Sequence, residues 1–230
     1  MEPTPGTSTE TILKPEIKAK KKRVLTVRNV YDKKFKTITL TDQWQAAIGK
    51  PQFTGCWFIY GPPKQGKTTF ALMLSKYLTS YGKVLFITAE EGISLAFKKA
   101  VKRHKMEEVE GRWFAIDSRE VPTVSDLIPV LQRQRGFEII FMDSVWFYRL
   151  SQKDYRTLKR LFPDKLFVYI SHVNNNGEPK GATADEIWRD SMVNFRVNGF
   201  RAFPVSRYGG GQTIDVFPER AAEYWGSVAN

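Results

Sequence analysis

Cysteine is almost absent from this chain of 230 residues, in which Cys56 is the only one. A single cysteine excludes a disulfide within the chain and a metal site built from several thiolates, and it is typical of proteins in a reducing compartment. Long apolar runs are also missing, because none approaches the ~20 residues that a membrane helix needs. The start, Met1 to Pro5, lacks the apolar segment of a secretory signal. We therefore expect a cytoplasmic protein that does not bind a membrane.

Negative charge is in short supply. The 36 Lys and Arg outnumber the 24 Asp and Glu, and ten of the basic but only four of the acidic residues fall within residues 1–36. The resulting net charge of +12 favours a polyanionic partner, although a basic tail that only aids solubility fits the same pattern. Residues 1–23 are predicted to form a disordered basic arm. We expect residues 24–230 to form a single domain, in which residues 24–40 alternate like an N-terminal hairpin.

Residues 61–68 read GPPKQGKT, which fits the phosphate-loop pattern G-x-x-x-x-G-K-[ST] at every fixed position. An apolar run precedes them, and residues 70–78 carry the apolar spacing of a helix. In such a strand-loop-helix unit, Lys67 would reach the β- and γ-phosphates and the Thr68 hydroxyl would bind Mg²⁺. We therefore predict ATP and Mg²⁺ as cofactors. The predicted nucleotide-binding residues are Gly61, Pro62, Pro63, Lys64, Gln65, Gly66, Lys67, Thr68 and Thr69.

Carboxylates follow two further predicted strands. Residues 84–87 run directly into Glu90 and Glu91, and residues 137–142 end at Asp143. A carboxylate at such a strand end can orient and deprotonate a water near the γ-phosphate, so Glu90 or Glu91 is the candidate base. Asp143 is the candidate for holding Mg²⁺ opposite Thr68. An acidic loop tip and a strand that merely ends in Asp are the structural alternatives.

Two other segments leave predicted strands near the same edge. His172 ends the strand at residues 166–170 and leads into a polar, glycine-containing loop, where it could hydrogen-bond a γ-phosphate; a structural histidine is the alternative. Trp146, Phe147, Tyr148 and Arg149 could stack on the bases of single-stranded nucleic acid or pack against a neighbouring helix or subunit.

The C-terminal part predicts strands near residues 192–197, 200–205 and 213–217, joined by short turns. We therefore predict an α/β fold with a mainly parallel central sheet, flanked by helices, and antiparallel strands at its C-terminal end.

Five segments carry a family resemblance: GPPKQGKTT, VLFITAEEG, FEIIFMDSV, YISHVNNNGEPKG and FRAFPVSRYGG. Over about residues 41–220, the chain resembles RecA-like P-loop ATPases, close to KaiC and the bacterial RadA (Sms) proteins. The resemblance implies that Glu90 is the base, that His172 is the sensor and that residues 173–182 form a DNA-facing loop. It also implies that Arg207 acts as an arginine finger in a neighbouring subunit of a ring or filament, for which a hexamer is plausible. Val205 stands where the family has a lysine, and RadA's zinc-finger and protease-like domains are missing.

Together these features predict a Mg²⁺-dependent ATPase that binds DNA, with single-stranded DNA favoured, and serves replication or recombination. The small size of the core is compatible with a phage or mobile-element origin. One alternative is a nucleotide-dependent adaptor or helicase loader with little turnover. Another is a P-loop kinase acting on a small molecule, which would need an arginine-rich lid that the sequence does not show.

Overall fold

The computed structural model describes residues 24–133 and 136–226. The chain divides into two units, of which the first ends at Phe35 and the second begins at Lys36. The boundary therefore falls within the segment that was predicted to open the single domain. The predicted disordered arm at residues 1–23 lies outside the described residues.

The predicted hairpin over residues 24–40 is wrong. Residues Val27–Tyr31 form a short helix, α1. Its start is fixed by a capping box, in which the Thr26 hydroxyl accepts a hydrogen bond from the Asn29 backbone N–H at 3.2 Å and Asn29 Oδ1 accepts one from the Thr26 N–H at 3.2 Å. These bonds satisfy N–H groups that a helix start leaves free, so local capping overrides the apolar alternation.

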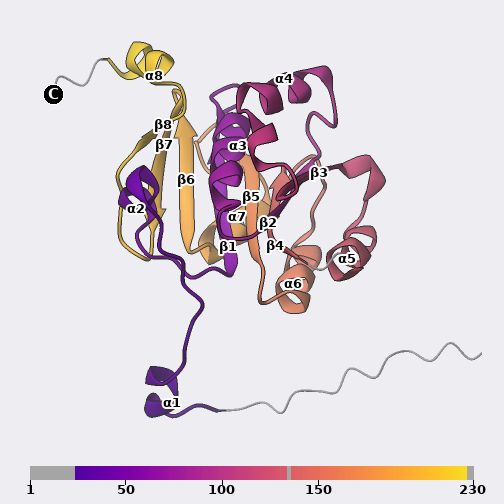
Figure 1. Cartoon of the computed structure of the whole chain (residues 1–230), viewed down its shortest axis with the longest axis vertical. Helices are drawn as coiled ribbons and strands as arrows, with labels where there is room; N and C mark the ends of the chain where they lie inside the picture. Colours follow the sequence, from indigo (N-terminus) through magenta and orange to yellow (C-terminus); the bar gives the residue numbers. More distant parts are fainter. Residues whose placement is uncertain (1–23, 134–135, 227–230) are drawn as a thin grey trace, which may run out of the picture. The chain divides into compact units, whose positions relative to one another are not determined.

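The second unit contains one sheet of eight strands with helices on both faces (Figure 1). The strands are β1 (Gly55–Gly61), β2 (Lys83–Thr88), β3 (Trp113–Asp117), β4 (Phe137–Asp143), β5 (Leu166–His172), β6 (Val193–Asn198), β7 (Arg201–Ser206) and β8 (Ile214–Asp215). The helices are α2 (Asp42–Ile48), α3 (Lys67–Leu78), α4 (Leu95–Arg103), α5 (Val124–Arg133), α6 (Gln152–Leu161), α7 (Ala182–Asp190) and α8 (Pro218–Trp225). None of the helices in the described ranges combines the length and the apolarity that spanning a bilayer demands.

The strand order is β3-β2-β4-β5-β1-β6-β7-β8. The strands from β3 to β6 are parallel, whereas β7 pairs antiparallel with both β6 and β8. The short turn at Gly199 and Phe200 reverses the chain between β6 and β7, and such a turn can join only antiparallel neighbours. The predicted mainly parallel sheet with antiparallel C-terminal strands is confirmed.

Strand β1 is buried on both faces of the sheet. Its side chains alternate, so that Trp57 and Ile59 join the core under α2 and α3, while Cys56 and Phe58 join the core under α5, α6 and α7. A central parallel strand needs this continuous apolar sequence, because helices cover both of its sides.

The carboxyl ends of the central strands meet at one edge of the sheet. In the pairing register, Gly61 at the end of β1 is opposite His172 at the end of β5, and Thr88 at the end of β2 is opposite Asp143 at the end of β4. The phosphate loop, the two acidic segments and the histidine therefore leave the sheet side by side, as their strand-end positions predicted.

Gly49 provides a test of how the end of α2 packs against the turn after β7. Its φ is +82°, and an added Cβ would lie 2.1 Å from the carbonyl oxygen of Tyr208. Gly49→Ala should therefore lower the free energy of unfolding by about 3 kcal/mol or more, through backbone strain and a backbone clash. Gly111→Ala is the matched control, because its φ is +78° but an added Cβ would meet nothing within 4 Å. It should cost only about 1 kcal/mol in urea unfolding; equal losses would contradict the packing argument.

Candidate active site

The phosphate loop joins β1 to α3 with backbone angles that its sequence permits. Gly66, directly before α3, has a φ of +97°, and Lys64 has a φ of +60°. At Gly61 an added Cβ would lie 1.9 Å from the carbonyl oxygen of Val197 on β6, so only glycine allows this close approach. The loop is also tied to the β6–β7 turn, where the Gly199 N–H donates to Gln65 Oε1 at 2.7 Å.

Thr68 and Asp143 are in direct contact, although 75 positions separate them along the chain. The Thr68 hydroxyl donates to Asp143 Oδ2 at 2.9 Å, whereas the buried Oδ1 of Asp143 has no hydrogen-bond partner among the described residues. Burial raises the pKa of Asp143 to about 6, against the lowering effect of the Thr68 hydrogen bond. The carboxylate is thus desolvated and has one oxygen free to bind a ligand.

Lys67 lies at the first position of α3 and is buried. Its ammonium donates to the carbonyl oxygen of Pro62 at 2.7 Å, within the loop itself. Burial lowers the pKa of Lys67, while the negative charges of Glu90 and Asp143 act in the opposite direction. The ammonium therefore lies within the electrostatic reach of both carboxylates.

Glu90 and His172 form a pair at the same edge. A hydrogen bond of 2.9 Å joins Glu90 Oε2 and His172 Nε2. Burial acts to raise the pKa of Glu90, but the hydrogen bond and electrostatic interaction with His172 and the positive charge of Lys67 outweigh this effect and lower it. By contrast, burial and the charge of Glu90 raise the pKa of Glu91. The two glutamates therefore differ in their surroundings, because Glu90 is held by His172 whereas no hydrogen-bond partner of the Glu91 side chain lies within residues 24–133 and 136–226.

No family model matches the sequence, and no curated protein matches it. Among solved structures, the chain is similar to the flagellar accessory protein FlaH of Methanocaldococcus jannaschii, with a TM-score of 0.56 and 13% identity, covering 78% of this chain and 92% of that one. It is also similar to a second solved structure, that of an ATPase domain, with a TM-score of 0.49 and 12% identity, covering 73% and 83% of the two chains. The fold is an α/β fold of RecA-like type, with a mainly parallel sheet and antiparallel C-terminal strands.

The edge of this RecA-like sheet fits a magnesium nucleotide on its own geometry. Oxygen ligands are the ones that Mg²⁺ prefers, and the hydroxyl of Thr68 and the unpartnered carboxylate oxygen of Asp143 supply two of them. Lys67 supplies a positive charge beside them, and its present partner is a neutral carbonyl. A polyanion bound here would give that charge a partner of opposite sign.

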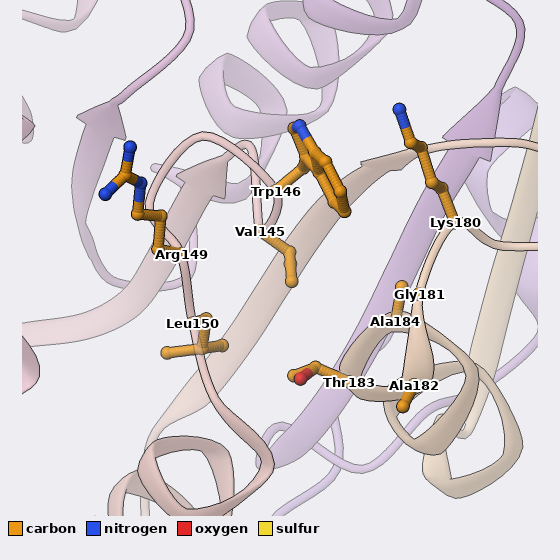
Figure 2. Close-up of a pocket in the computed structure, with 9 residues that line it drawn as sticks. All are labelled: Val145, Trp146, Arg149, Leu150, Lys180, Gly181, Ala182, Thr183 and Ala184. Atoms are coloured by element: carbon orange, nitrogen blue, oxygen red, sulfur yellow. The ribbon is translucent and has the colours of Figure 1, made fainter.

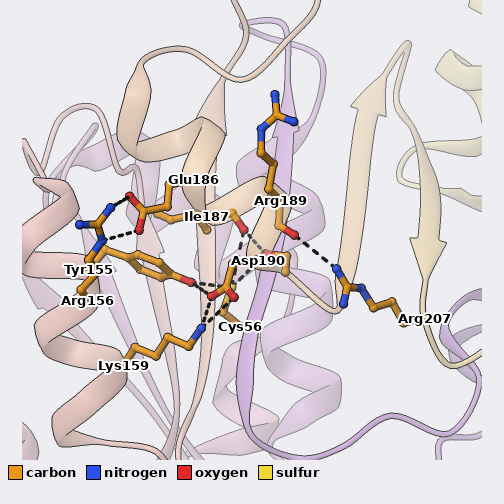
Figure 3. Close-up of polar contacts among 10 residues, drawn as sticks. Cys56, Tyr155, Arg156, Lys159, Glu186, Ile187, Arg189, Asp190 and Arg207 are labelled. Atoms are coloured by element: carbon orange, nitrogen blue, oxygen red, sulfur yellow. Dashed lines mark hydrogen bonds and ion pairs between the residues drawn. The ribbon is translucent and has the colours of Figure 1, made fainter.

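Arg207 is not brought to this site. It follows β7, and its backbone N–H donates to the carbonyl oxygen of Met192, just before β6 begins. Because β6 runs parallel to β1, Arg207 lies at the edge where these strands start, opposite the phosphate loop. Its side chain is exposed and donates to the carbonyl oxygen of Arg189 at 3.4 Å (Figure 3). Within one RecA-like domain it cannot serve the nucleotide edge.

Two contacts near the edge that carries the phosphate loop were not predicted from the sequence. The first is the tie between Gln65 and Gly199. The second is a cation-π contact in which the Lys180 ammonium lies 4.2 Å from the centre of the Trp146 ring (Figure 2). The aromatic cluster itself was recognisable from its composition. Its basic partner was not, because α6 and β5 separate the two residues along the chain and no local pattern pairs them.

Proposed function

We propose that the chain is a Mg²⁺-dependent ATPase of the KaiC and RadA branch, which works as a homo-oligomer on single-stranded DNA in replication or recombination. The observation that carries the ATPase part is the contact of Thr68 with the buried Asp143 beside Lys67, at the end of a phosphate loop. Thr68 and Asp143 would hold Mg²⁺, and Lys67 with the loop N–H groups would hold the phosphates. The bound ion would neutralise charge on the phosphate oxygens during hydrolysis.

Glu90 is the stronger candidate for the base that orients the attacking water. Its lowered pKa keeps it ionised at neutral pH, and its bond to His172 fixes the carboxylate in one direction. His172 continues into the loop at residues 173–181, where the Lys180 N–H donates to the His172 carbonyl oxygen at 2.9 Å. A change at the γ-phosphate would thus reach this loop through one side chain and its own backbone.

Replacing each glutamate by glutamine tests this assignment. Glu90→Gln should lower ATP turnover by about 10²- to 10⁴-fold while leaving ATP binding largely intact, because it removes the base but preserves the shape of the side chain. Glu91→Gln is the matched control and should stay within a few-fold of the parent rate. Turnover and nucleotide affinity are measured separately, by phosphate release and by titration with a fluorescent ATP analogue. Equal turnover in all three proteins would mean that the water is activated elsewhere.

The proposed DNA surface is the segment that follows β4, residues 145–150. Trp146 and Phe147 are 49% and 50% exposed, which is unusual for such large apolar side chains. Hollows of about 460 and 440 Å³ lie on the two sides of the segment, and Arg149 lines both. Figure 2 shows the first hollow, which Lys180 also lines and to which no carboxylate contributes. Exposed rings between basic side chains suit stacked bases and a phosphate backbone.

Removing the exposed ring tests this surface. Trp146→Ala should weaken binding of a fluorescent single-stranded oligonucleotide about tenfold or more at fixed ionic strength, since stacking of one base contributes ~1–3 kcal/mol. It should also reduce any stimulation of turnover by that DNA without changing basal turnover. Phe114→Ala, at a partly exposed ring on the edge strand β3, is the control. If the parent chain and the Phe114→Ala variant both fail to bind DNA at low salt, the adaptor or helicase-loader function would replace this proposal.

The proposal that the chain works as a homo-oligomer is based on the position of Arg207. An exposed arginine at the edge opposite the phosphate loop could act only on a nucleotide held by another copy of the chain, as an arginine finger. Head-to-tail contacts of this kind generate a closed ring or a helical filament.

Mixing two inactive variants tests action in trans. Arg207→Ala should leave ATP affinity largely unchanged but lower turnover by about 10³-fold, because the transition state loses a cation. Lys67→Ala should lose nucleotide binding or turnover. A mixture of the two should recover part of the activity, since a mixed interface can pair an intact phosphate loop with an intact Arg207. Turnover that is independent of protein concentration, by a chain that stays monomeric with ATP and DNA, would exclude this mechanism.

A further inference from the structure

A separate recess lies at the edge of the sheet where β1 and β5 begin. It has a volume of about 190 Å³ and lies between these strands and α6. The seven residues of β1 separate it from the phosphate loop by roughly 20 Å, at ~3.3 Å per residue. None of the candidate nucleotide, metal or catalytic residues lines it. For comparison, an engineered apolar cavity of ~150 Å³ binds benzene, so the recess has room for one ring.

The walls of the recess are aromatic. Four rings line it: Tyr155 and Phe162 from α6 and its C-terminal end, and Phe167 and Tyr169 from β5. The rings of Phe167 and Tyr169 are stacked with their centres 5.8 Å apart, and Tyr155 meets Tyr169 edge to face at 5.6 Å. Rings arranged in both orientations around one space favour a planar aromatic guest over a branched aliphatic one.

Most polar groups around the inner part of the recess satisfy one another. Lys159 Nζ donates to Asp190 Oδ1 at 2.7 Å, the Tyr155 hydroxyl also donates to Asp190, and Cys56 Sγ lies 2.9 Å from Ser191 Oγ (Figure 3). The exception is Tyr169. Its side chain is 1% exposed and lines the recess, yet its hydroxyl makes no hydrogen bond with any residue of the described ranges. The hydroxyl lines the recess and is therefore free to donate a hydrogen bond to a ligand there.

The charge of the recess is positive. Of the residues that the structure describes, two lysines and no Asp or Glu line it. Lys159 is neutralised by its ion pair with Asp190. Within the described part of the chain, the Lys165 ammonium meets neutral groups: it donates to the carbonyl oxygen of Phe137 at 2.5 Å and lies 5.8 Å from the centre of the Phe162 ring. Lys165 directly precedes β5, and it alternates with Phe167 and Tyr169 of that strand, so the recess is lined in that order by a cation, a ring and a hydroxyl. A ligand that matches this order has an anionic group at one end of a ring and an acceptor at the other.

We propose that this recess binds a one-ring aromatic acid, with its carboxylate at Lys165, its ring between Phe162 and Phe167, and a para substituent at the Tyr169 hydroxyl. The site is independent of the nucleotide edge and of the proposed ATPase activity. Because the ligand would bind only the folded chain, it would raise thermal stability by mass action.

Calorimetric titration of the full chain with benzoate and with 4-hydroxybenzoate tests the proposal. Both acids should bind saturably below about 10 mM, which is within the range that ten or so ligand atoms can supply. 4-Hydroxybenzoate should bind more tightly, because its phenol oxygen can accept from Tyr169. Lys165→Gln should weaken both acids about tenfold, the effect of losing one charge-assisted hydrogen bond. Tyr169→Phe should leave benzoate binding unchanged and abolish the advantage of the hydroxylated acid.

Lys153→Gln on α6 is the matched control, because Lys153 is exposed and does not line the recess. It should bind both acids as the parent chain does. Cys56 supplies an independent readout, since it lines the recess and is the only thiol of the chain. Bound 4-hydroxybenzoate should slow its alkylation by N-ethylmaleimide, as followed by intact mass. Absence of saturable binding, or equal binding by the parent, Lys165→Gln and Tyr169→Phe proteins, would overturn the proposal.

Discussion

The central position of β1, buried on both faces, is the constraint on which the rest of the structure depends. Each large side chain of this strand that leaves water contributes ~1.5–3 kcal/mol, and the two cores hold the strand from opposite sides. The phosphate loop continues directly from this strand, which therefore fixes its position. At Gly61, where the loop begins, the backbone packs against the carbonyl of Val197. The α/β packing therefore fixes where the loop can present its N–H groups before any ligand is considered.

The candidate site is a small set of charges that balance one another at reduced solvation. Lys67 and Asp143 are buried, and each has a pKa shifted toward its neutral form by burial. Glu90 is stabilised as an anion by His172 and Lys67. Buried charges are tolerated only when partners of opposite sign lie near them. A bound phosphate would add a negative partner for Lys67, and a metal ion would add a positive partner for Asp143.

Sequence patterns predicted the strands of the sheet well because the burial of each strand requires a run of neighbouring apolar residues. A strand covered on both faces must be apolar throughout, and residues 56–60, 84–87, 139–142 and 166–170 all show this. The prediction for residues 24–40 was wrong because alternation over a few residues does not outweigh a capping box at Thr26 and Asn29. Short exposed segments lack a core that would decide between strand and helix.

The sequence by itself determined the phosphate loop and the acidic strand ends, because glycines, a lysine and carboxylates at fixed offsets from apolar strands follow from nearest-neighbour rules. It did not determine which glutamate has a partner, that Lys180 lies on Trp146, or that Arg207 lies at the edge opposite the phosphate loop. Those facts depend on the strand order β2-β4-β5-β1-β6-β7, which brings together residues distant in the chain. Only tertiary packing selects that order, since the sequences of apolar strands with similar composition do not specify which strands pair with each other.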